Sequence, residues 1–296
     1  MTPAHTEITL HRDGLTLSAH RFGEPDAPLV ILMHGFPDTP HSWDAAVPPL
    51  VAAGYQVLAP WLRGYTLGSY SRTARYDLPA VAADIAAWQH EFGGAPAHLV
   101  GHDWGAFAAI HLAKTAPQQW KSLSVLAIPP FGGRAAARST LPYLPRQTLM
   151  SSYIGLMQSA AAPRLLARSD AALVRRIWAR WSPGWAFTDD QFAPTRAVFT
   201  DQRLGWAATR YYRALFRAHR PETREFYRIL TAPPAPLPTL ALAGADDGCL
   251  HPGLQRALAD SVGAHAIQLP GCGHFLHAEL PEQVAAQLLS HFRNSD

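Results

Sequence analysis

The sequence predicts an α/β fold with a mostly parallel central sheet flanked by helices, interrupted by a helical insertion. Three observations favour this fold class. Short apolar runs without polar alternation recur along the chain, as in strands that are buried on both faces of a parallel sheet. Helical patterns lie between these runs. Over residues 131–231 the alternation stops, and only helical stretches rich in arginine and tryptophan follow.

The first strands are expected in a hairpin and in four buried runs. The segment ITLHRDGLTLSAHRF has two stretches of alternating polarity around Asp13-Gly14, which is a strong hairpin signal. The buried runs are LVILMH (29–34), QVLAP (56–60), AHLVGH (97–102) and SLSVLAI (122–128). Between the second and third of them, an apolar stripe at helical spacing predicts a helix through Leu78, Val81, Ile85, Trp88 and Phe92. Gly93-Gly94 favour a left-handed cap at its end.

The strand pattern resumes after the insertion. The segment TAPPAPLP (231–238) is typical of a stiff linker. Further strands are expected at TLALAG (239–244) and AIQLP (266–270). The last helix is expected over PEQVAAQLLSHF (281–292), with a proline in its first turn.

The chain of 296 residues has room for one large domain with an insertion. We expect an α/β core over residues 1–130 and 232–296, and a helical segment over residues 131–231. Hydrophobic residues make up 48% and charged residues 16%, which is typical of a globular protein. No run of about 18 apolar residues occurs, and the N-terminus lacks the pattern of a secretory signal. We therefore expect a cytoplasmic protein without a membrane span.

The two cysteines, Cys249 and Cys272, exclude a disulfide scaffold and a cysteine-ligated zinc cluster. The sequence does not show whether they pair, and two reduced thiols are the simpler expectation for a cytoplasmic protein.

The predicted insertion is strongly basic. Residues 131–231 contain 16 arginines and 6 acidic residues, a net charge of +10, whereas the rest of the chain carries −7. A surface for anionic substrates, membranes or nucleic acid is one interpretation. Because the arginines are scattered and form no tract, the sequence favours a solvated helical layer, with no nucleic-acid or membrane partner.

The central motif is GHDWG (101–105), with Asp103 in the middle, between a predicted strand and a predicted helix. The flanking glycines allow a sharp turn that exposes one side chain above the sheet, and the helix N-terminus favours an anion there. A carboxylate is a poor nucleophile toward esters and amides, but it displaces a leaving group at saturated carbon by forming an ester. Asp103 therefore points to epoxides or alkyl halides. The structural alternative is a helix N-cap aspartate.

A second motif, HGFP (34–37), follows the first buried strand. A loop at this place and the residue after the nucleophile together supply the backbone N–H groups of an oxyanion hole. We expect those of Phe36 and Trp104, each worth up to about 3–4 kcal/mol in the tetrahedral intermediate. For the histidine of this loop a structural role is the simpler expectation. The candidate substrate-binding residues are His34, Gly35 and Pro37.

The C-terminal part supplies an acid and a base. Asp246 and Asp247 directly follow one predicted strand, and His274 follows another, just before the last helix. Along the chain the nucleophile comes first, then the acid, then the histidine, which is the order expected when the nucleophile lies on a strand-to-helix turn of this kind. We expect His274 to be the base and Asp247 its acid partner. Asp246 stays an alternative acid.

Four motifs of this sequence resemble those of a known enzyme family. HGFP (34–37), LRGY (62–65), GHDWG (101–105) and CGHF (272–275) occur in the order found in the epoxide hydrolases of the α/β-hydrolase superfamily. The chain resembles that family over nearly its whole length, which implies an α/β-hydrolase fold with the insertion as a helical cap domain. It also implies that a carboxylate opens an epoxide and that a histidine–acid pair activates water, which gives a vicinal diol without metal or organic cofactor. Trp61 stands where many relatives have an aspartate.

In that family two cap tyrosines hydrogen-bond the epoxide oxygen. SSYIGLMQ (151–158) and ATRYYRALF (208–216) resemble the segments that carry them. The resemblance implies Tyr153 and Tyr212, with Tyr211 as the alternative to the second. A phenol with a pKa of about 10 can donate a proton to the basic alkoxide as it develops. Packing within the helical segment is the alternative for each.

Haloalkane dehalogenase is the nearest alternative function, because that family shares the aspartate turn, the histidine base and the tryptophan after the nucleophile. The HDWG context resembles epoxide hydrolases more closely, and a halide leaves without a proton, so it needs no tyrosine pair. A non-catalytic ligand-binding protein of this fold is an alternative of another class. Asp103 disfavours a serine-type esterase. The expected partner is a small-molecule epoxide, and a homodimer has no support in the sequence.

Overall fold

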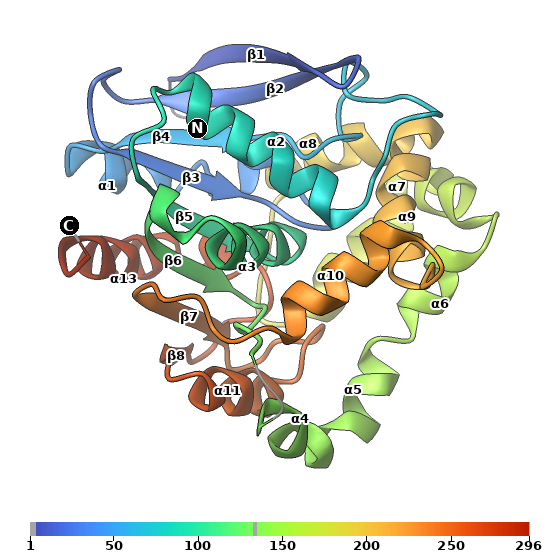
Figure 1. Cartoon of the computed structure of the whole chain (residues 1–296). Helices are drawn as coiled ribbons and strands as arrows, with labels where there is room; N and C mark the ends of the chain where they lie inside the picture. Colours follow the sequence, from blue (N-terminus) through green and yellow to red (C-terminus); the bar gives the residue numbers. More distant parts are fainter. Residues whose placement is uncertain (1–3, 133–134, 296) are drawn as a thin grey trace.

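The computed structural model describes residues 4–132 and 135–295. Its centre is an eight-stranded sheet in the order β1-β2-β4-β3-β5-β6-β7-β8 (Figure 1). The strands are β1 (Thr6–Arg12), β2 (Leu15–Phe22), β3 (Leu29–Met33), β4 (Gln56–Pro60), β5 (Ala97–His102), β6 (Trp120–Leu126), β7 (Thr239–Gly244) and β8 (His265–Leu269). Strand β2 is antiparallel to β1 and β4, and the other neighbouring pairs are parallel. The predicted fold class is confirmed.

Helices cover both faces of the sheet. Those outside the segment between β6 and β7 are α1 (Val47–Ala52), α2 (Leu78–Glu91), α3 (Trp104–Thr115), α11 (Pro252–Ser261), α12 (Leu276–Glu279) and α13 (Pro281–Arg293). The side chains of β3 alternate between two apolar clusters, with Ile31 and Met33 beside α2 and α3, and Val30 and Leu32 beside α1 and α13. Burial on both faces therefore explains the uninterrupted apolar run of β3.

The helix α2 follows the predicted stripe. Leu78, Val81, Ile85 and Trp88 are buried, and the chain turns away from the helix through Gly93 and Gly94 at φ 89° and 69°. None of the described helices is both long and apolar enough to cross a membrane.

Between β6 and β7, the described residues form helical elements only. They are α4 (Ala135–Thr140), α5 (Leu144–Met150), α6 (Tyr153–Gln158), α7 (Ala162–Trp181), α8 (Asp189–Thr200), α9 (Gln202–Leu215) and α10 (Pro221–Thr231), with a 3₁₀ turn at Leu141–Tyr143. Figure 1 shows α6, α7 and α9 beyond the carboxyl ends of the parallel strands. In the middle of α7 the backbone is left-handed at Ser169, Asp170 and Ala171. We call α4–α10 the inserted helices; α6, α7 and α9 stand over the edge at which β3 and β5 end, whereas α4 packs against α11, and α10 packs against α2 and α3.

A buried ion pair fixes the loop between β4 and α2. The guanidinium of Arg63 is 1% exposed and donates to Asp84 in α2 through Nε (2.6 Å) and Nη2 (2.5 Å). Its Nη1 donates to the carbonyl oxygen of Arg75 (2.9 Å), and its own carbonyl oxygen accepts a hydrogen bond from the Tyr211 hydroxyl (2.8 Å). Arg63 therefore joins this loop to α2 and to α9.

We expect Asp84→Ala to lower the free energy of unfolding by about 3–5 kcal/mol, because it leaves the buried Arg63 guanidinium with only the exposed carboxylate of Asp13, at 3.2 Å. The matched control is Asp260→Ala, which breaks the exposed Arg256–Asp260 pair (2.9 Å) on α11 and should cost less than about 1 kcal/mol. Urea unfolding followed by tryptophan fluorescence measures both. Equal losses in the two variants would contradict a structural role for the buried pair.

Candidate active site

Asp103 stands at a sharp turn between β5 and α3. Its backbone has φ 49° and ψ −117°, a conformation that non-glycine residues rarely adopt. Close packing of the backbone around this turn explains why glycine stands at two nearby positions. A Cβ on Gly105 would lie 2.5 Å from the carbonyl oxygen of Met33, and a Cβ on Gly35 would lie 2.5 Å from Oδ1 of Asp103. The turn therefore presents the Asp103 side chain against the loop that follows β3.

The buried Asp103 carboxylate has a partner at each oxygen. Oδ1 accepts a hydrogen bond of 2.8 Å from the backbone N–H of Phe36, and Oδ2 lies 3.7 Å from Nε2 of His274. Burial raises the pKa of Asp103, but the His274 ring and the Phe36 N–H outweigh burial and leave the pKa below its usual value. Asp103 is therefore ionised at neutral pH, with Oδ1 held by backbone and Oδ2 facing the histidine.

His274 follows β8, and Asp247 follows β7. Nδ1 of His274 donates to Oδ2 of Asp247 at 3.0 Å. The Asp247 carboxylate also accepts hydrogen bonds from the Cys249 N–H (2.7 Å) and from Nε2 of Gln255 (2.9 Å). Asp246 is exposed, whereas Asp247 is buried. The structure thus brings Asp247, and not Asp246, to the histidine.

The charge of His274 depends on these two carboxylates. Burial lowers the pKa of His274, but the negative charges of Asp247 and Asp103 outweigh burial and raise the pKa to about 10. The imidazole is therefore protonated at neutral pH, between two carboxylates. Its Nε2 has no hydrogen-bond partner within the described residues and is directed at Asp103.

The end of α7 holds the His274 loop. The backbone N–H of His274 donates to the carbonyl oxygen of Trp181 (3.1 Å) and to Oγ of Ser182 (2.9 Å). Ser182 in turn donates to Glu279 (2.5 Å), whose other oxygen accepts from the Gly273 N–H (2.9 Å). No sequence pattern identifies Ser182 and Glu279, since neither belongs to a motif with a recognisable spacing.

Tyr153 on α6 and Tyr212 on α9 lie side by side, with ring centroids 5.7 Å apart. The Tyr212 ring also contacts Phe36 (5.1 Å) and Trp104 (5.0 Å), so it stands over the turn after β5. Its hydroxyl is buried without a hydrogen-bond partner in the described part of the chain. The Tyr153 hydroxyl lies 3.7 Å from Sγ of Cys249. Burial raises the pKa of both phenols well above the usual value, so both stay protonated.

The neighbouring Tyr211 has a different environment. Its hydroxyl donates to the carbonyl oxygen of Arg63, and this hydrogen bond holds the β4–α2 loop against α9. Both cysteines, Cys249 and Cys272, are buried and free.

The HGFP loop is held by backbone contacts. His34 accepts a hydrogen bond from the Leu62 N–H at Nε2 (3.0 Å), which leaves Nδ1 to donate to the carbonyl oxygen of Gly35 (2.9 Å). The carbonyl oxygen of Pro37 accepts a hydrogen bond from Nε1 of Trp178 on α7 (2.7 Å). Both His34 nitrogens are thus engaged by backbone, as the structural interpretation expects. Substrate contact by His34, Gly35 and Pro37 stays a prediction.

Three buried side chains meet behind the His274 loop. His102 donates from Nε2 to the carbonyl oxygen of His274 (3.0 Å), and its Nδ1 lies 3.7 Å from Oδ2 of Asp38. Nε2 of His277 lies 3.5 Å from the same oxygen. Burial raises the pKa of Asp38 to about 6. Among the described residues, two groups have ligand atoms close enough together to hold a metal ion: Asp38, His102 and His277, and His20, His41 and Asp44.

The sequence profile of the alpha/beta hydrolase family matches residues 30–287. The chain belongs to this family. It is 30% identical to Epoxide hydrolase A of Mycobacterium tuberculosis, with 97% of each chain covered, and 28% identical to the AB hydrolase superfamily protein YfhM of Bacillus subtilis, with 96% of this chain and 97% of that protein covered. The crystal structure of Epoxide Hydrolase A from Mycobacterium thermoresistibile superposes with a TM-score of 0.80 at 26% identity, over 99% of both chains. The resemblance to epoxide hydrolases and the α/β-hydrolase fold are thereby confirmed.

The raised pKa of His274 predicts a pH-dependent contribution to stability. An unfolded histidine has a pKa of about 6.5, so protonated His274 stabilises the fold fully below about pH 6.5, and this contribution is lost as the pH rises toward about 10. We expect the difference in unfolding free energy between the wild type and His274→Gln to shrink over this range. Urea unfolding at several pH values measures it. Titratable groups that do not interact with His274 cancel between the two proteins, and a constant difference would contradict the charged imidazole.

Proposed function

We propose that this protein is an epoxide hydrolase that converts an epoxide into a vicinal diol through an ester on Asp103. One observation carries the proposal: a buried, ionised carboxylate at the turn after β5 faces a protonated histidine, and two protonated phenols are gathered above the same turn. A carboxylate opens the three-membered ring, and a phenol supplies the proton that the departing oxygen needs.

In the first step, Oδ2 of Asp103 attacks a ring carbon, and the bond from that carbon to the epoxide oxygen breaks. We assign the attack to Oδ2 because the Phe36 N–H already binds Oδ1. The epoxide oxygen takes a proton from the phenol of Tyr212 or Tyr153 as its negative charge develops. The tyrosinate then recovers a proton from His274. The products are a neutral hydroxyalkyl ester and a neutral imidazole.

Loss of the Asp103 charge prepares the second step. One of the two carboxylates that raise the pKa of His274 has become an ester, so the pKa of the imidazole falls and the ring stays neutral. Neutral His274, oriented by Asp247, takes a proton from water, and the hydroxide adds to Cγ of the ester. The N–H groups of Phe36 and Trp104 stabilise the charge that develops on Oδ1. When the intermediate collapses, the bond from Cγ to Oδ2 breaks, and the departing oxygen takes the proton of the added hydroxyl. The diol leaves, and the Asp103 carboxylate and the protonated histidine are restored.

In this proposal the inserted helices act as a cap domain over residues 131–231, on a core of residues 1–130 and 232–296. Helices α6 and α9 carry the two tyrosines, and the end of α7 holds the His274 loop. Three aromatic side chains from α7, α8 and the loop between them pack on each other in the core of the cap: Trp178 contacts Trp185 (5.1 Å) and Phe192 (5.3 Å). Trp181 of α7 instead contacts the rings of His274 (5.0 Å) and Tyr153 (4.9 Å) at the candidate active site.

The nucleophile and the reaction class can be tested together by trapping the ester. We expect His274→Gln to slow ester hydrolysis by about 10²–10⁴-fold, because no base remains to activate water. Incubated with a panel of aryl and alkyl epoxides, this variant should gain the mass of one whole epoxide, and peptide mapping should place it on Asp103. Asp103→Ala should show neither adduct nor turnover.

The same experiment separates the alternatives. An alkyl adduct formed only from alkyl halides, with halide released, would instead establish a dehalogenase. An Asp103→Ala variant that still forms diol would rule out the ester mechanism.

The role of Tyr212 is tested against its neighbour. We expect Tyr212→Phe to slow the alkylation step about 10²-fold and to leave ester hydrolysis nearly unchanged, because the phenol donates only when the ring opens. The matched control is Tyr211→Phe, which removes the hydrogen bond to Arg63 and should leave the alkylation rate close to that of the wild type. Stopped-flow fluorescence separates the two steps, and equal slowing of both by Tyr212→Phe would argue against proton donation.

A further inference from the structure

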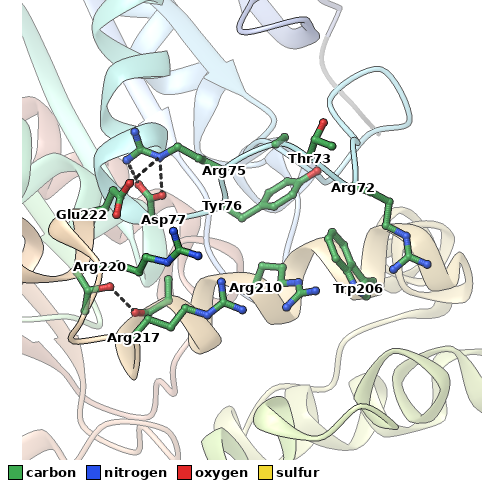
Figure 2. Close-up of a pocket in the computed structure, with 13 residues that line it drawn as sticks. Arg72, Thr73, Arg75, Tyr76, Asp77, Trp206, Arg210, Arg217, Arg220 and Glu222 are labelled. Carbon is green, nitrogen blue, oxygen red and sulfur yellow. Dashed lines mark hydrogen bonds and ion pairs between the residues drawn. The ribbon is translucent and has the colours of Figure 1, made fainter.

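A cavity of about 300 Å³ lies on the outer side of α9, and none of its lining residues belongs to the candidate active site. It is bounded by the loop between β4 and α2, by α9 and by the start of α10. Figure 2 shows that its walls carry an unusual density of guanidinium groups. They belong to Arg72, Arg75, Arg210, Arg217 and Arg220. The two acidic lining residues are Asp77 and Glu222, so three positive charges are in excess.

The acids are already occupied by one arginine. Arg75 binds Asp77 at 2.7 Å and lies 4.0 Å from Glu222, at one end of the cavity (Figure 2). The other four arginines form no ion pair with any carboxylate in residues 4–132 and 135–295. Their guanidinium groups therefore line the cavity without a counter-charge from the chain.

Trp206 fixes two of these groups in place. The guanidinium carbon of Arg210 lies 4.1 Å from the centroid of the indole ring, and that of Arg72 lies 5.0 Å from it. Figure 2 shows them on either side of the ring. Such cation–π contacts hold a guanidinium in place, while its N–H groups, which lie in the plane of the guanidinium, stay available as donors. The two arginines, from segments far apart in the sequence, are thus positioned before any ligand binds.

The cluster is electrostatically unfavourable as it stands. Burial lowers the pKa of Arg210, and the positive charges of Arg213, Arg217 and Arg72 lower it further. A bound anion would relieve this repulsion, and the relief would add to the binding free energy.

We propose that this cavity binds a small molecule that carries a diphosphate group. Guanidinium groups form paired hydrogen bonds with phosphate oxygens, and each phosphoryl group offers about three strong acceptors. Four unpaired arginines exceed what one carboxylate can satisfy, whereas two linked phosphoryl groups offer acceptors to all four and carry about −3, which balances the excess of three positive charges. The volume is at the lower end of the range for small-molecule sites, roughly 300–1,000 Å³.

The shape of the site favours a small anion over an extended polyanion. Asp77 and Glu222 close one end of the cavity and would repel a phosphate chain that continued past them (Figure 2). Nucleic acid and anionic membranes need an open stripe or plane of basic groups instead.

Isothermal titration calorimetry with inorganic pyrophosphate at low ionic strength tests the proposal. We expect one saturable site per chain in the wild type. Arg210→Gln should weaken binding about tenfold, as should Arg217→Gln, because each removes charge-assisted hydrogen bonds to the anion. The control is Arg176→Gln, which removes the same charge from an exposed position on α7 outside the cavity and should leave the affinity unchanged.

Thermal unfolding and far-ultraviolet circular dichroism without pyrophosphate check that each variant is folded. No saturable binding by the folded wild type up to about 1 mM pyrophosphate would overturn the proposal. So would equal weakening by Arg176→Gln, which would indicate a general charge effect. A short single-stranded oligonucleotide or anionic vesicles that bind more tightly than pyrophosphate, with the same dependence on Arg210, would show that the arginines form a surface for polyanions and not a diphosphate site.

Two further titrations identify the source of the diphosphate. Adenosine diphosphate that binds more tightly than pyrophosphate would show that the cavity also contacts the organic part of a nucleotide. Equal affinities would show that the diphosphate alone is recognised. Because calorimetry measures binding directly, these results do not depend on whether the protein hydrolyses epoxides.

Discussion

The rest of the site depends on keeping one carboxylate ionised inside the protein. A buried Asp103 without partners would take up a proton and lose its negative charge. The Phe36 N–H and the protonated His274 prevent this, and each comes from a different loop at the same edge of the sheet. This requirement explains the strained backbone of Asp103 and the glycine at position 35, since a side chain there would occupy the space of Oδ1.

The same interaction orders the two chemical steps of the proposed mechanism. In the resting protein the imidazole lies between two carboxylates and holds its proton. Ester formation removes one negative charge at 3.7 Å from Nε2, so the base is released only after the nucleophile has reacted. Asp247 keeps its hydrogen bonds from Cys249 and Gln255 throughout, so it orients the ring in both steps.

Much of this site was predictable because parallel strands bring their carboxyl ends to one edge. Asp103, Asp247 and His274 each follow a strand, so three distant motifs were expected to meet. Local pattern could not separate Asp246 from Asp247, because both follow β7 and only burial distinguishes them. Ser182 and Glu279 have no sequence signature for a related reason: they bind each other across 97 residues and hold the His274 loop through its backbone N–H groups.

The arginine-rich composition of the inserted helices also has a spatial explanation. On α9, Tyr211 and Tyr212 are buried, while Trp206 and Arg210 line the outer cavity. Scattered arginines in the sequence thus converge through helical spacing and through Arg72 from another segment. Tyr211 also binds the β4–α2 loop that carries Arg72. An anion held between Arg72 and Arg210 would therefore join this loop more firmly to the helix that presents Tyr212 to the active site, which links the two sites through one element.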